Sequence, residues 1–510
     1  MIASRSTATW GSVLLAVLSA RAAVVELNVA NAPGHAVGPS FLGLSYEKNT
    51  IYTPLFRSDN SGLIALFQRL GPGILRVGGN SVDLTRWDFA GTGLVKGTVA
   101  PADLTRLAGF LRATDWKVIY GVNLSVSTPD TAASEAAAAD SILGDRLAGL
   151  EIGNEPDLYY KNGDRPATWT FEQFRAEWDS FHVAMAQRAP GVPFTGPATA
   201  GTGTWLDDFA HQEANNISLL TFHYYVSNGQ LATSTVAKLL QPNPGLGTTL
   251  HLYDSIALAT GIPGGFRVAE TNSYYNGGAP GVSASYGSGL WALEYLFTLA
   301  SSGGSGLNFH GGGSGPGYTP IADNSSTGAV VQVRPEYYAL SLFSLVAHGL
   351  VRKAALSDSS VLSGWTVDDS DGSRHIVLLN EDTLQNVSVA LHPGSGFDQP
   401  ISYTLSGTNL DSSTGVTLGG VPIGTDGSWN PSPTAWTLVG DSLVTTVAPA
   451  TARIFTFRKA NSIQPPAKVK LPATVAGPAF DPAGHTLPAR DPSDLRIRLH
   501  RGLEDLSPAP

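Results

Sequence analysis

The chain has 510 residues, which is enough for more than one domain, and apolar residues make up 42% of it. Charged residues make up only 14%, while 57 glycines and 33 prolines are typical of a protein rich in loops. The formal net charge of −10 argues against a protein that binds nucleic acids or other polyanions, because such proteins need a basic surface.

The first 22 residues have the pattern of a secretory signal peptide. Arg5 supplies a positive charge, an apolar run covers residues 13–18, and Ala20-Arg21-Ala22 matches a cleavage site. The run is too short to span a bilayer. We therefore expect a secreted, extracellular protein that has no membrane partner and begins near Ala23. Sequons that predict N-glycosylation on this route stand at Asn216, Asn324 and Asn386.

Between residues 41 and 349, short apolar runs alternate with longer helical patterns, which is the signature of repeated βα units. The predicted strands are 41–46, 74–78, 118–123, 149–153, 192–196, 219–223, 266–269 and 306–309. Amphipathic helices are predicted at 63–70, 102–113, 171–187 and 285–300. Eight buried parallel strands with helical crossovers predict an α/β fold, a (β/α)8 TIM-type barrel. An open doubly wound sheet is the alternative.

From residue 350 to residue 459 the apolar pattern has a period of two, which predicts an antiparallel β-sandwich. The predicted strands are 361–367, 375–379, 387–391, 401–405, 435–439, 443–447 and 450–457. The N-terminal segment 23–40 contains another such run at residues 24–29, and we expect this strand to join the sandwich. Residues 460–510 are rich in proline and lack periodicity, so they predict a disordered tail.

Polar side chains follow three predicted barrel strands at their carboxyl ends, where barrel enzymes carry their functional residues. Asn154-Glu155-Pro156 follows the fourth strand, Glu270-Thr271-Asn272 follows the seventh, and the sixth ends in His223-Tyr224-Tyr225. Because the fourth and seventh strands lie across the barrel from each other, we expect Glu155 and Glu270 to face each other. Glu151 is a rival acid, but it lies inside an apolar run and is expected in the barrel interior.

Two facing carboxyl groups about 5–5.5 Å apart are what glycoside hydrolysis with retention of configuration requires. We predict that Glu155 is the acid/base, because Asn154 beside it can bind a sugar 2-OH. Glu270 is then the nucleophile that forms a covalent glycosyl-enzyme intermediate. Tyr225 is expected to donate a hydrogen bond to Glu270 and to keep it ionised. This chemistry needs no cofactor and no metal ion, and none is expected.

Five runs at these strand ends resemble glycoside hydrolase family 79, the family of β-glucuronidases and heparanases. The runs are FLGLSYE (41–47), LRVGGNSVD (75–83), NEP (154–156), HYY (223–225) and ETNSYYNGGAP (270–280). The resemblance covers residues 24–458, and its most specific part is the run that begins at Glu270. It implies the same barrel-plus-sandwich fold and a carbohydrate substrate that bears β-glucuronate.

The resemblance also implies further substrate-binding residues. Glu47 matches an acidic residue that binds sugar hydroxyls, and Asn80 and Ser81 would line the same subsite. Tyr275 and Asn276 follow the nucleophile and would contact the sugar.

Glucuronate recognition in the family uses backbone N–H groups and a tyrosine in the loop after the eighth strand. Here that loop reads HGGGSGPGY (310–318), so the resemblance assigns this role to Gly317 and Tyr318. Glycine lets the backbone approach a ligand closely, and N–H and phenol donors can bind a carboxylate without a cation. A flexible glycine loop without a ligand is the alternative.

The resemblance therefore implies removal of terminal β-linked glucuronic acid, with or without a 4-O-methyl group, from glycans. Heparanases act within sulfated chains through basic groove residues, whereas this chain is acidic and its barrel loops lack a Lys/Arg cluster. Arg76 is expected to pair with the acidic centre. This departure favours an exo-acting retaining β-glucuronidase. The alternatives are an endo-acting heparanase-like hydrolase and a non-catalytic carbohydrate-binding barrel.

Overall fold

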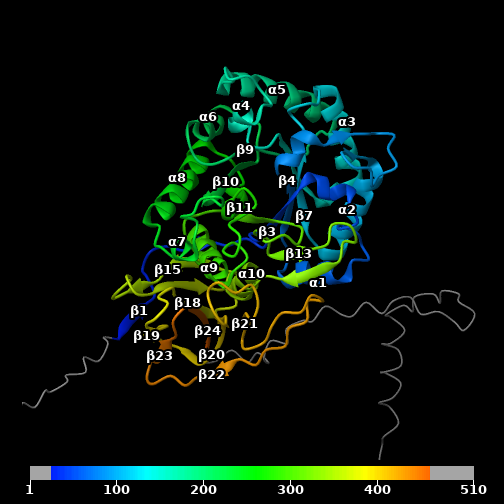
Figure 1. The fold of residues 1–510 in the computed structure, drawn as a ribbon. Helices are drawn as coiled ribbons and strands as arrows, with labels where there is room; N and C mark the ends of the chain where they lie inside the picture. Colours follow the sequence, from blue (N-terminus) through cyan, green and yellow to red (C-terminus); the bar gives the residue numbers. More distant parts are fainter. Residues whose placement is uncertain (1–23, 460–510) are drawn as a thin grey trace, which may run out of the picture. The chain divides into compact units, whose positions relative to one another are not determined.

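The computed structural model describes residues 24–459, so the predicted signal peptide and the predicted tail lie outside the described residues. Within this range, eight parallel strands close into a barrel, which confirms the predicted TIM-type fold and excludes an open sheet (Figure 1). Around the barrel the strands are β3 (Gly43–Glu47), β4 (Ile74–Gly78), β7 (Lys117–Val122), β8 (Leu147–Ile152), β9 (Phe194–Thr199), β10 (Leu219–Asn228), β11 (Phe266–Tyr275) and β12 (Gly306–Gly311).

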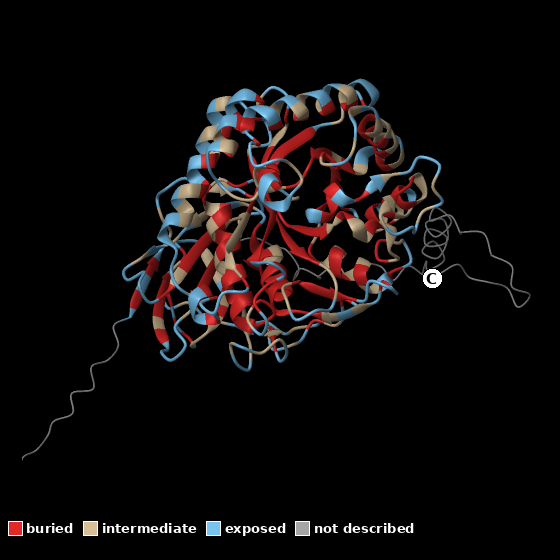
Figure 2. Ribbon diagram, turned by 45° about the horizontal axis from the view of Figure 1, so that its top comes forward, coloured by how far each residue is buried: buried red, intermediate tan, exposed pale blue. Residues whose placement is uncertain are grey.

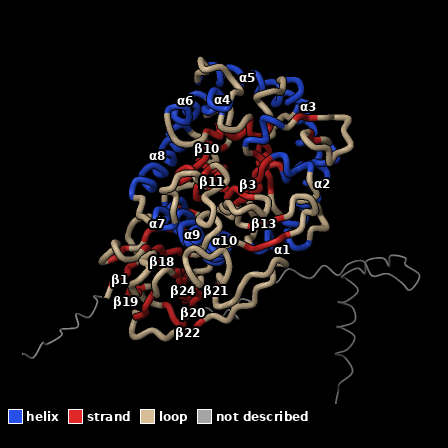
Figure 3. Tube along the Cα trace, in the orientation of Figure 1, coloured by secondary structure: helices blue, strands red, loops and turns tan. Residues whose placement is uncertain are grey.

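Helices surround these strands, and the strands form the buried centre of the molecule (Figures 2 and 3). The helices are α1 (Ser61–Arg69), α2 (Pro101–Thr114), α3 (Pro129–Leu143), α4 (Tyr159–Asn162), α5 (Phe171–Arg188), α6 (Thr204–Gln212), α7 (Val236–Leu239), α8 (Pro244–Thr260), α9 (Tyr286–Ser301) and α10 (Pro335–Val346). Short 3-10 turns are η1 (Lys48–Tyr52), η2 (Asn80–Leu84), η3 (Gly144–Arg146) and η4 (Pro156–Leu158). Of the described helices, none is both long and apolar enough to cross a membrane.

Helix α5 illustrates how the sequence produces these elements. It begins after Thr170, whose hydroxyl accepts from the Gln173 N–H, while the Gln173 side chain accepts from the Thr170 N–H at 3.0 Å. This reciprocal capping satisfies two donors that the first helical turn leaves unpaired. The helix then buries Phe174, Trp178 and Phe181, which recur every three or four residues and so share one face. That face packs in the barrel core.

A buried arginine joins the first and last strands of the barrel at their amino ends. Arg267 donates to carbonyl or amide oxygens of Ser40 (3.0 Å), Phe41 (3.2 Å), Leu307 (2.9 Å) and Asn308 (2.6 Å). These acceptors lie on both sides of the seam between β12 and β3. Burial lowers the pKa of Arg267 to about 9. The carbonyl dipoles satisfy most of its N–H donors and partly compensate for that burial.

The rest of the described chain forms a β-sandwich, as predicted. Its smaller sheet has the order β16 (Ala355–Leu356), β1 (Val25–Asn28), β19 (Val387–His392) and β23 (Leu443–Val447). The larger sheet has the order β2 (His35–Ala36), β15 (Leu350–Lys353), β17 (Ser363–Asp368), β18 (Arg374–Asn380), β24 (Thr451–Lys459), β20 (Phe397–Ser406) and β21 (Thr417–Leu418), with β22 (Thr434–Ala435) beside β20. Separate short pairs are β5 (Arg86–Trp87) with β6 (Thr98–Val99), and β13 (Ile321–Asp323) with β14 (Val330–Val333).

One pair of strands departs from the predicted antiparallel arrangement. The N-terminal strand β1 joins the sandwich as expected, but it runs parallel to β19. A parallel pair needs a long crossover connection, and here the whole barrel lies between the two strands in the sequence. The predicted strand 435–439 is also wrong beyond Ala435, where β22 ends. Trp436 Nε1 donates to Ser402 Oγ at 2.9 Å, and Val439 is exposed.

The larger sheet of the sandwich is buried on both faces. Along β18, Ile376 and Leu378 pack against the smaller sheet, while Val377 and Leu379 belong to the core that includes the barrel helices. On β17, the Trp365 ring stacks on Phe297 of α9 with 5.3 Å between centroids. Because β18 buries apolar residues on both faces, the period of two predicted for this strand is wrong between Ile376 and Leu379. The sandwich and the barrel therefore share one core.

Tyr286 at the start of α9 offers a test of this junction. Its hydroxyl lies 2.8 Å from the carbonyl oxygen of Ala450 and 3.1 Å from that of Leu405, both in the sandwich. We expect Tyr286→Phe to lower the free energy of unfolding by about 1 kcal/mol, because a buried hydrogen bond is lost. Urea denaturation measures this difference. The control Tyr160→Phe, at an exposed position, should change stability little; equal effects of the two substitutions would contradict the assignment.

Candidate active site

The residues that the sequence singles out come together at the carboxyl end of the barrel. Glu155 follows β8 and begins the turn η4; its φ is +51° and its N–H donates to the Ala198 carbonyl at 2.8 Å. Glu270 lies within β11, which extends to Tyr275 and is longer than the predicted strand. Likewise His223 and Tyr225 lie within β10 rather than at its end.

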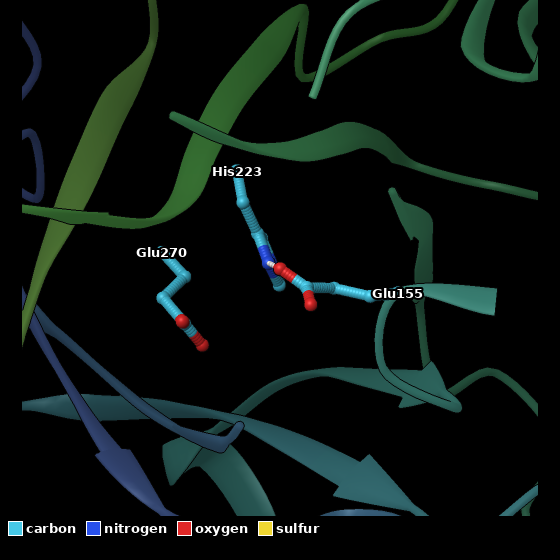
Figure 4. Close-up of side chains that lie close together, drawn as sticks. All are labelled: Glu155, His223 and Glu270. Carbon is cyan, nitrogen blue, oxygen red and sulfur yellow. Dashed lines mark hydrogen bonds and ion pairs between the residues drawn. The ribbon is translucent and has the colours of Figure 1, made fainter. Parts of the chain in front are cut away.

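Glu155 and Glu270 approach each other from opposite sides, with His223 next to Glu155 (Figure 4). Among the described residues, one carboxylate oxygen of each glutamate and one ring nitrogen of His223 lie within 4.8 Å of one another. The Glu270 side chain is 9% exposed and that of Glu155 is 16% exposed. The two carboxyl groups are therefore close enough to act on one small group placed between them.

Arg76 holds Glu270 and Glu151 in the barrel interior. The guanidinium is fully buried; its Nε donates to Glu151 Oε2 at 2.6 Å and its Nη1 to Glu270 Oε2 at 2.8 Å. Its Nη2 donates to Asn154 Oδ1 at 2.9 Å. Burial alone would lower the pKa of Arg76, but the charges of Glu151 and Glu270 raise it above its ordinary value. Arg76 is thus a permanent cation whose donors face inward rather than toward a ligand.

The surroundings of Glu270 favour its ionised form. Tyr225 O–H donates to Glu270 Oε1 at 2.7 Å, which is the hydrogen bond that the sequence predicts. Burial alone would raise the pKa of Glu270, but His310, His223, Arg76 and the bond from Tyr225 together bring it well below its ordinary value. Both oxygens of this carboxylate therefore accept from fixed donors and keep one orientation.

Glu155 contacts a histidine that the sequence reasoning left without a role. His223 Nδ1 lies 2.9 Å from Glu155 Oε1, and the imidazole is fully buried. The nearby Asp157 accepts from the Ala200 N–H at 3.0 Å. Burial is the main cause that raises the pKa of Asp157 to about 6, and the charge of Glu155 adds to it. Glu155 is thus placed between a histidine and a second acid.

A second histidine, His310 at the end of β12, lies between two carboxylates. Its Nε2 is 3.6 Å from Glu47 Oε1, and its Nδ1 is 3.7 Å from Glu270 Oε2 and 3.1 Å from Ser45 Oγ. Burial alone would lower the pKa of His310, but Glu270 and Glu47 raise it. Burial would raise the pKa of Glu47, but the contact with His310 lowers it overall. The family resemblance implies a sugar-binding role for Glu47, and the structure adds this histidine partner.

The other residues predicted after β4 and β8 lie in the same network. Ser81 N–H donates to Glu47 Oε2 at 2.7 Å. Asn154 is buried, and its Nδ2 donates to Asn80 Oδ1 at 3.2 Å. Asn80 itself is exposed. The backbone of Asn154 is held by Asp83, whose Oδ2 accepts its N–H at 3.1 Å. Asn154 is therefore fixed next to Glu155 from several directions.

The predicted residues of the last two loops divide into two groups. Tyr318 lies beside the site, with its ring centroid 5.8 Å from that of Tyr225 and 5.8 Å from that of His310. The Gly317 carbonyl accepts from Arg334 at 2.6 Å. Tyr275 lies further out and is 44% exposed, with its ring 6.3 Å from Tyr225. Asn276 is exposed, and its Nδ2 donates to Asn228 Oδ1 at 3.0 Å, which holds a loop together.

Glu155, His223 and Glu270 also have the residue types of a metal site. Carboxylate oxygens and an imidazole nitrogen within 4.8 Å of one another are a set that Zn²⁺ can bind. However, each Glu270 oxygen already accepts a hydrogen bond, from Arg76 or from Tyr225. A second cation beside Arg76 would also be repelled. The arrangement therefore suits acid/base and nucleophilic chemistry better than metal binding.

Three groups at this site have no role in the site predicted from the sequence. His223 could have been found, because it stands two residues before Tyr225 on one strand and shares its face. His310 could have been found because it directly follows a predicted strand. Asp83 accepts from the N–H groups of Leu124 and Asn154 and so joins the loops after β4, β7 and β8. No local pattern marks such a buried hub.

The chain is similar in sequence to curated proteins named β-glucuronidase and heparanase. No protein-family model matches it. A β-glucuronidase of Aspergillus niger is 27% identical, and the alignment covers 61% of this chain but only 63% of the relative, less than two thirds of its length. A heparanase of Gallus gallus is 24% identical, with 57% of this chain and 66% of the relative covered. These relatives fit the β-glucuronidase and heparanase-like family, so the predicted resemblance is confirmed.

Solved structures share the fold. A 4-O-α-L-rhamnosyl-β-D-glucuronidase from Fusarium oxysporum matches with a TM-score of 0.69 at 18% identity, and covers 84% of this chain and 100% of its own. An arabinofuranosidase from Xanthomonas axonopodis matches with a TM-score of 0.62 at 15% identity, over 85% of this chain and 100% of its own. At these identities the matches establish the shared architecture, a barrel joined to a sandwich.

Arg76→Met should test the buried ion pairs. Removing the cation leaves Glu151 and Glu270 buried without it, so we expect a loss of about 3–5 kcal/mol in the free energy of unfolding at pH 7. In the variant, protonation relieves the unpaired carboxylates, so the loss should shrink at pH 5. Urea denaturation at pH 7 and at pH 5 measures the loss in the free energy of unfolding. Arg57→Met, which removes an exposed ion pair, is the control; a loss as small as in this control would contradict the role of Arg76.

Proposed function

We propose that the chain is a secreted, exo-acting retaining β-glucuronidase, which removes terminal β-linked glucuronic acid from glycans. The observation that carries this proposal is the facing pair of carboxyl groups, Glu155 and Glu270, with oxygens within 4.8 Å of each other. Retaining glycosidases hold their carboxyl groups about 5–5.5 Å apart, whereas inverting enzymes leave about 6.5–9.5 Å for a water molecule. The separation found here supports the retaining mechanism.

In this mechanism Glu270 attacks the anomeric carbon of the sugar. The bond from that carbon to the leaving-group oxygen breaks as Glu155 donates its proton to this oxygen, and a glycosyl ester of Glu270 forms. Water then attacks the same carbon while Glu155 takes up one of its protons, which releases the sugar and restores both carboxyl groups. The low pKa of Glu270 supports the nucleophile role, because the attacking group must be ionised.

Neighbouring side chains fit the two roles. Tyr225 and Arg76 donate to the two oxygens of Glu270 and aim its carboxylate. His223 contacts Glu155 and orients it, while Asn154 lies one residue before it. Glu47, with its neighbour Ser81, is proposed to bind sugar hydroxyls. These groups come from separate barrel strands, which is how one barrel end assembles a site.

The choice of glucuronate as the sugar rests on relatives and on one loop. The curated relative from Aspergillus niger is named a β-glucuronidase, and the matching Fusarium oxysporum structure is a rhamnosyl-glucuronidase in a complex with Rha-GlcA. In this chain Tyr318 lies beside Tyr225 and His310, next to Glu270. A phenol and backbone N–H groups at that position would bind the sugar carboxylate. The proposed substrate is terminal glucuronic acid with or without a 4-O-methyl group.

An endo-acting heparanase-like activity is the second candidate, because heparanases are among the curated relatives. The charges near the site favour the exo-acting enzyme. Arg76 is saturated by Glu151, Glu270 and Asn154, and Lys48 is buried in a pair with Glu135 at 2.6 Å. A chromogenic β-glucuronide assayed beside intact heparan sulfate separates the two candidates. Cleavage of the polymer alone would overturn the exo-acting proposal.

Substitution of the two glutamates should give different losses. With an aryl β-glucuronide, Glu270→Ala should abolish turnover, because no nucleophile remains. Glu155→Ala should retain some turnover, since general acid catalysis contributes about 10²–10⁴-fold and an aryl leaving group needs little protonation. The exposed Glu172→Ala on α5 is the control and should keep the wild-type rate. Near-normal activity of Glu270→Ala would refute its assignment as the nucleophile.

The stereochemistry of the reaction tests the mechanism directly. Two displacements at the anomeric carbon should release β-glucuronic acid first, before mutarotation mixes the anomers. Proton NMR spectra recorded during the first minutes of hydrolysis distinguish the two anomers. The α-anomer as the first product would exclude the covalent intermediate and with it the proposed role of Glu270.

A further inference from the structure

The loop between β12 and β13 has a composition that should leave it mobile. Residues 312–318, named here the glycine loop, contain four glycines and no regular secondary structure. Glycine loses more conformational entropy on ordering than any other residue. A loop of this kind binds a ligand tightly only if other contacts order it beforehand. Otherwise the entropy lost when the loop becomes ordered reduces the free energy of binding.

One buried arginine supplies such contacts. Arg334 precedes α10 and is 5% exposed. Its Nη1 donates to the Gly317 carbonyl at 2.6 Å, and its Nη2 donates to the Gly315 carbonyl at 2.6 Å and to that of Ser314 at 3.3 Å. The planar guanidinium fixes the directions of these donors, so the carbonyls must adopt one arrangement. The glycine loop is therefore held by a side chain that lies outside it.

The neighbouring loop after β11 confines the glycine loop from the side. A Cβ at position 317 would overlap the carbonyl oxygen of Gly277, so only glycine fits there. At Gly278, whose φ is +91°, a Cβ would lie 2.8 Å from the Tyr318 nitrogen. The two loops thus meet backbone to backbone. Together with Arg334, this contact fixes where the Tyr318 side chain enters the site.

We propose that Arg334 is a specificity-determining positioning residue, which holds the glycine loop so that Gly317 and Tyr318 are ready to bind the carboxylate of the sugar. The inference rests on the proposed function. Arg334 reaches the site only through the loop: its donors end on loop carbonyls, and Tyr318 then lies 5.8 Å, ring to ring, from Tyr225. Releasing the loop weakens hydrogen bonds that are charge-assisted only when the sugar carries a carboxylate. A sugar with a neutral group in place of the carboxylate is therefore affected much less.

The test compares two substrates of nearly the same shape, an aryl β-glucuronide and its 6-carboxamide, of which only the first carries a negative charge. Arg334→Gln and Arg334→Lys should lower kcat/KM for the glucuronide by about 10–100-fold, the worth of one or two hydrogen bonds to a charged group. KM should rise more than kcat falls, because the loop must be ordered on binding. The carboxamide should lose less than about threefold, so that the preference for the charged substrate collapses.

Arg69→Lys is the matched control. Like Arg334, Arg69 donates to a backbone carbonyl: its Nε lies 2.9 Å from the carbonyl oxygen of Gly427. Gly427 belongs to the sandwich part of the chain, so this bond does not hold the glycine loop. Arg69→Lys should leave kcat/KM unchanged for both substrates. Arg334→Lys keeps the charge and is expected to fold; hydrogen exchange of amides 312–318 should be faster in it than in the wild type. In an E270Q background, calorimetry with both substrates measures binding without turnover.

The outcomes separate the two proposals. Equal losses on the glucuronide and the carboxamide, or an unchanged preference with unchanged exchange of the loop amides, would overturn the role of Arg334. Failure of the wild-type protein to hydrolyse any glucuronide would instead overturn the proposed function.

Discussion

One buried cation constrains the interior of the barrel. Arg76 extends from β4 and binds Glu151 on β8, Glu270 on β11 and Asn154 in the loop after β8. Two carboxylates on one guanidinium leave an excess of negative charge, which hydrogen bonds from Tyr225 and Thr221 help to offset. Because an unpaired buried charge is far more costly than a paired one, each member of this cluster fixes the identity and place of the others.

The same cluster makes the two facing glutamates different. Glu270 is buried between Arg76 and Tyr225, so its negative charge is solvated by the protein. Glu155 is more exposed and contacts His223, next to Asp157, whose pKa is raised to about 6. A pair of carboxyl groups in unlike environments is what acid/base and nucleophile roles require. The difference between the two proposed roles therefore depends on the position of Arg76, which donates to Glu270 and not to Glu155.

The barrel and the positions of the two glutamates could be predicted from the sequence. Both depend on the spacing of apolar residues and on the rule that parallel strands bring their carboxyl ends to one rim. The eight apolar runs locate the barrel strands, and parallel strands bring Glu155 and Glu270 to one rim. The role of His223 could have been predicted, since side chains alternate between the two faces of β10 and His223 shares a face with Tyr225. The role of Arg334 could not be predicted from the sequence, because tertiary packing determines its burial and the carbonyl groups to which it donates. The parallel direction of β1 likewise depends on the whole topology.

The sandwich supports one half of the active site through α10. The larger sheet packs its barrel-facing side chains against the helix layer that includes α9 and α10. The start of α10 then carries Glu336, which accepts from Asn272 Nδ2 at 3.1 Å and from Ser288 Oγ at 2.8 Å, and whose pKa burial raises to about 8. Arg334, which holds the glycine loop, directly precedes α10. On the other side, Asp83 joins the loops after β4, β7 and β8 around Asn154. The two carboxyl groups of the proposed catalytic pair thus lie on separately supported halves of the rim, and a sugar bound as proposed between Glu270 and Glu155 would contact both halves.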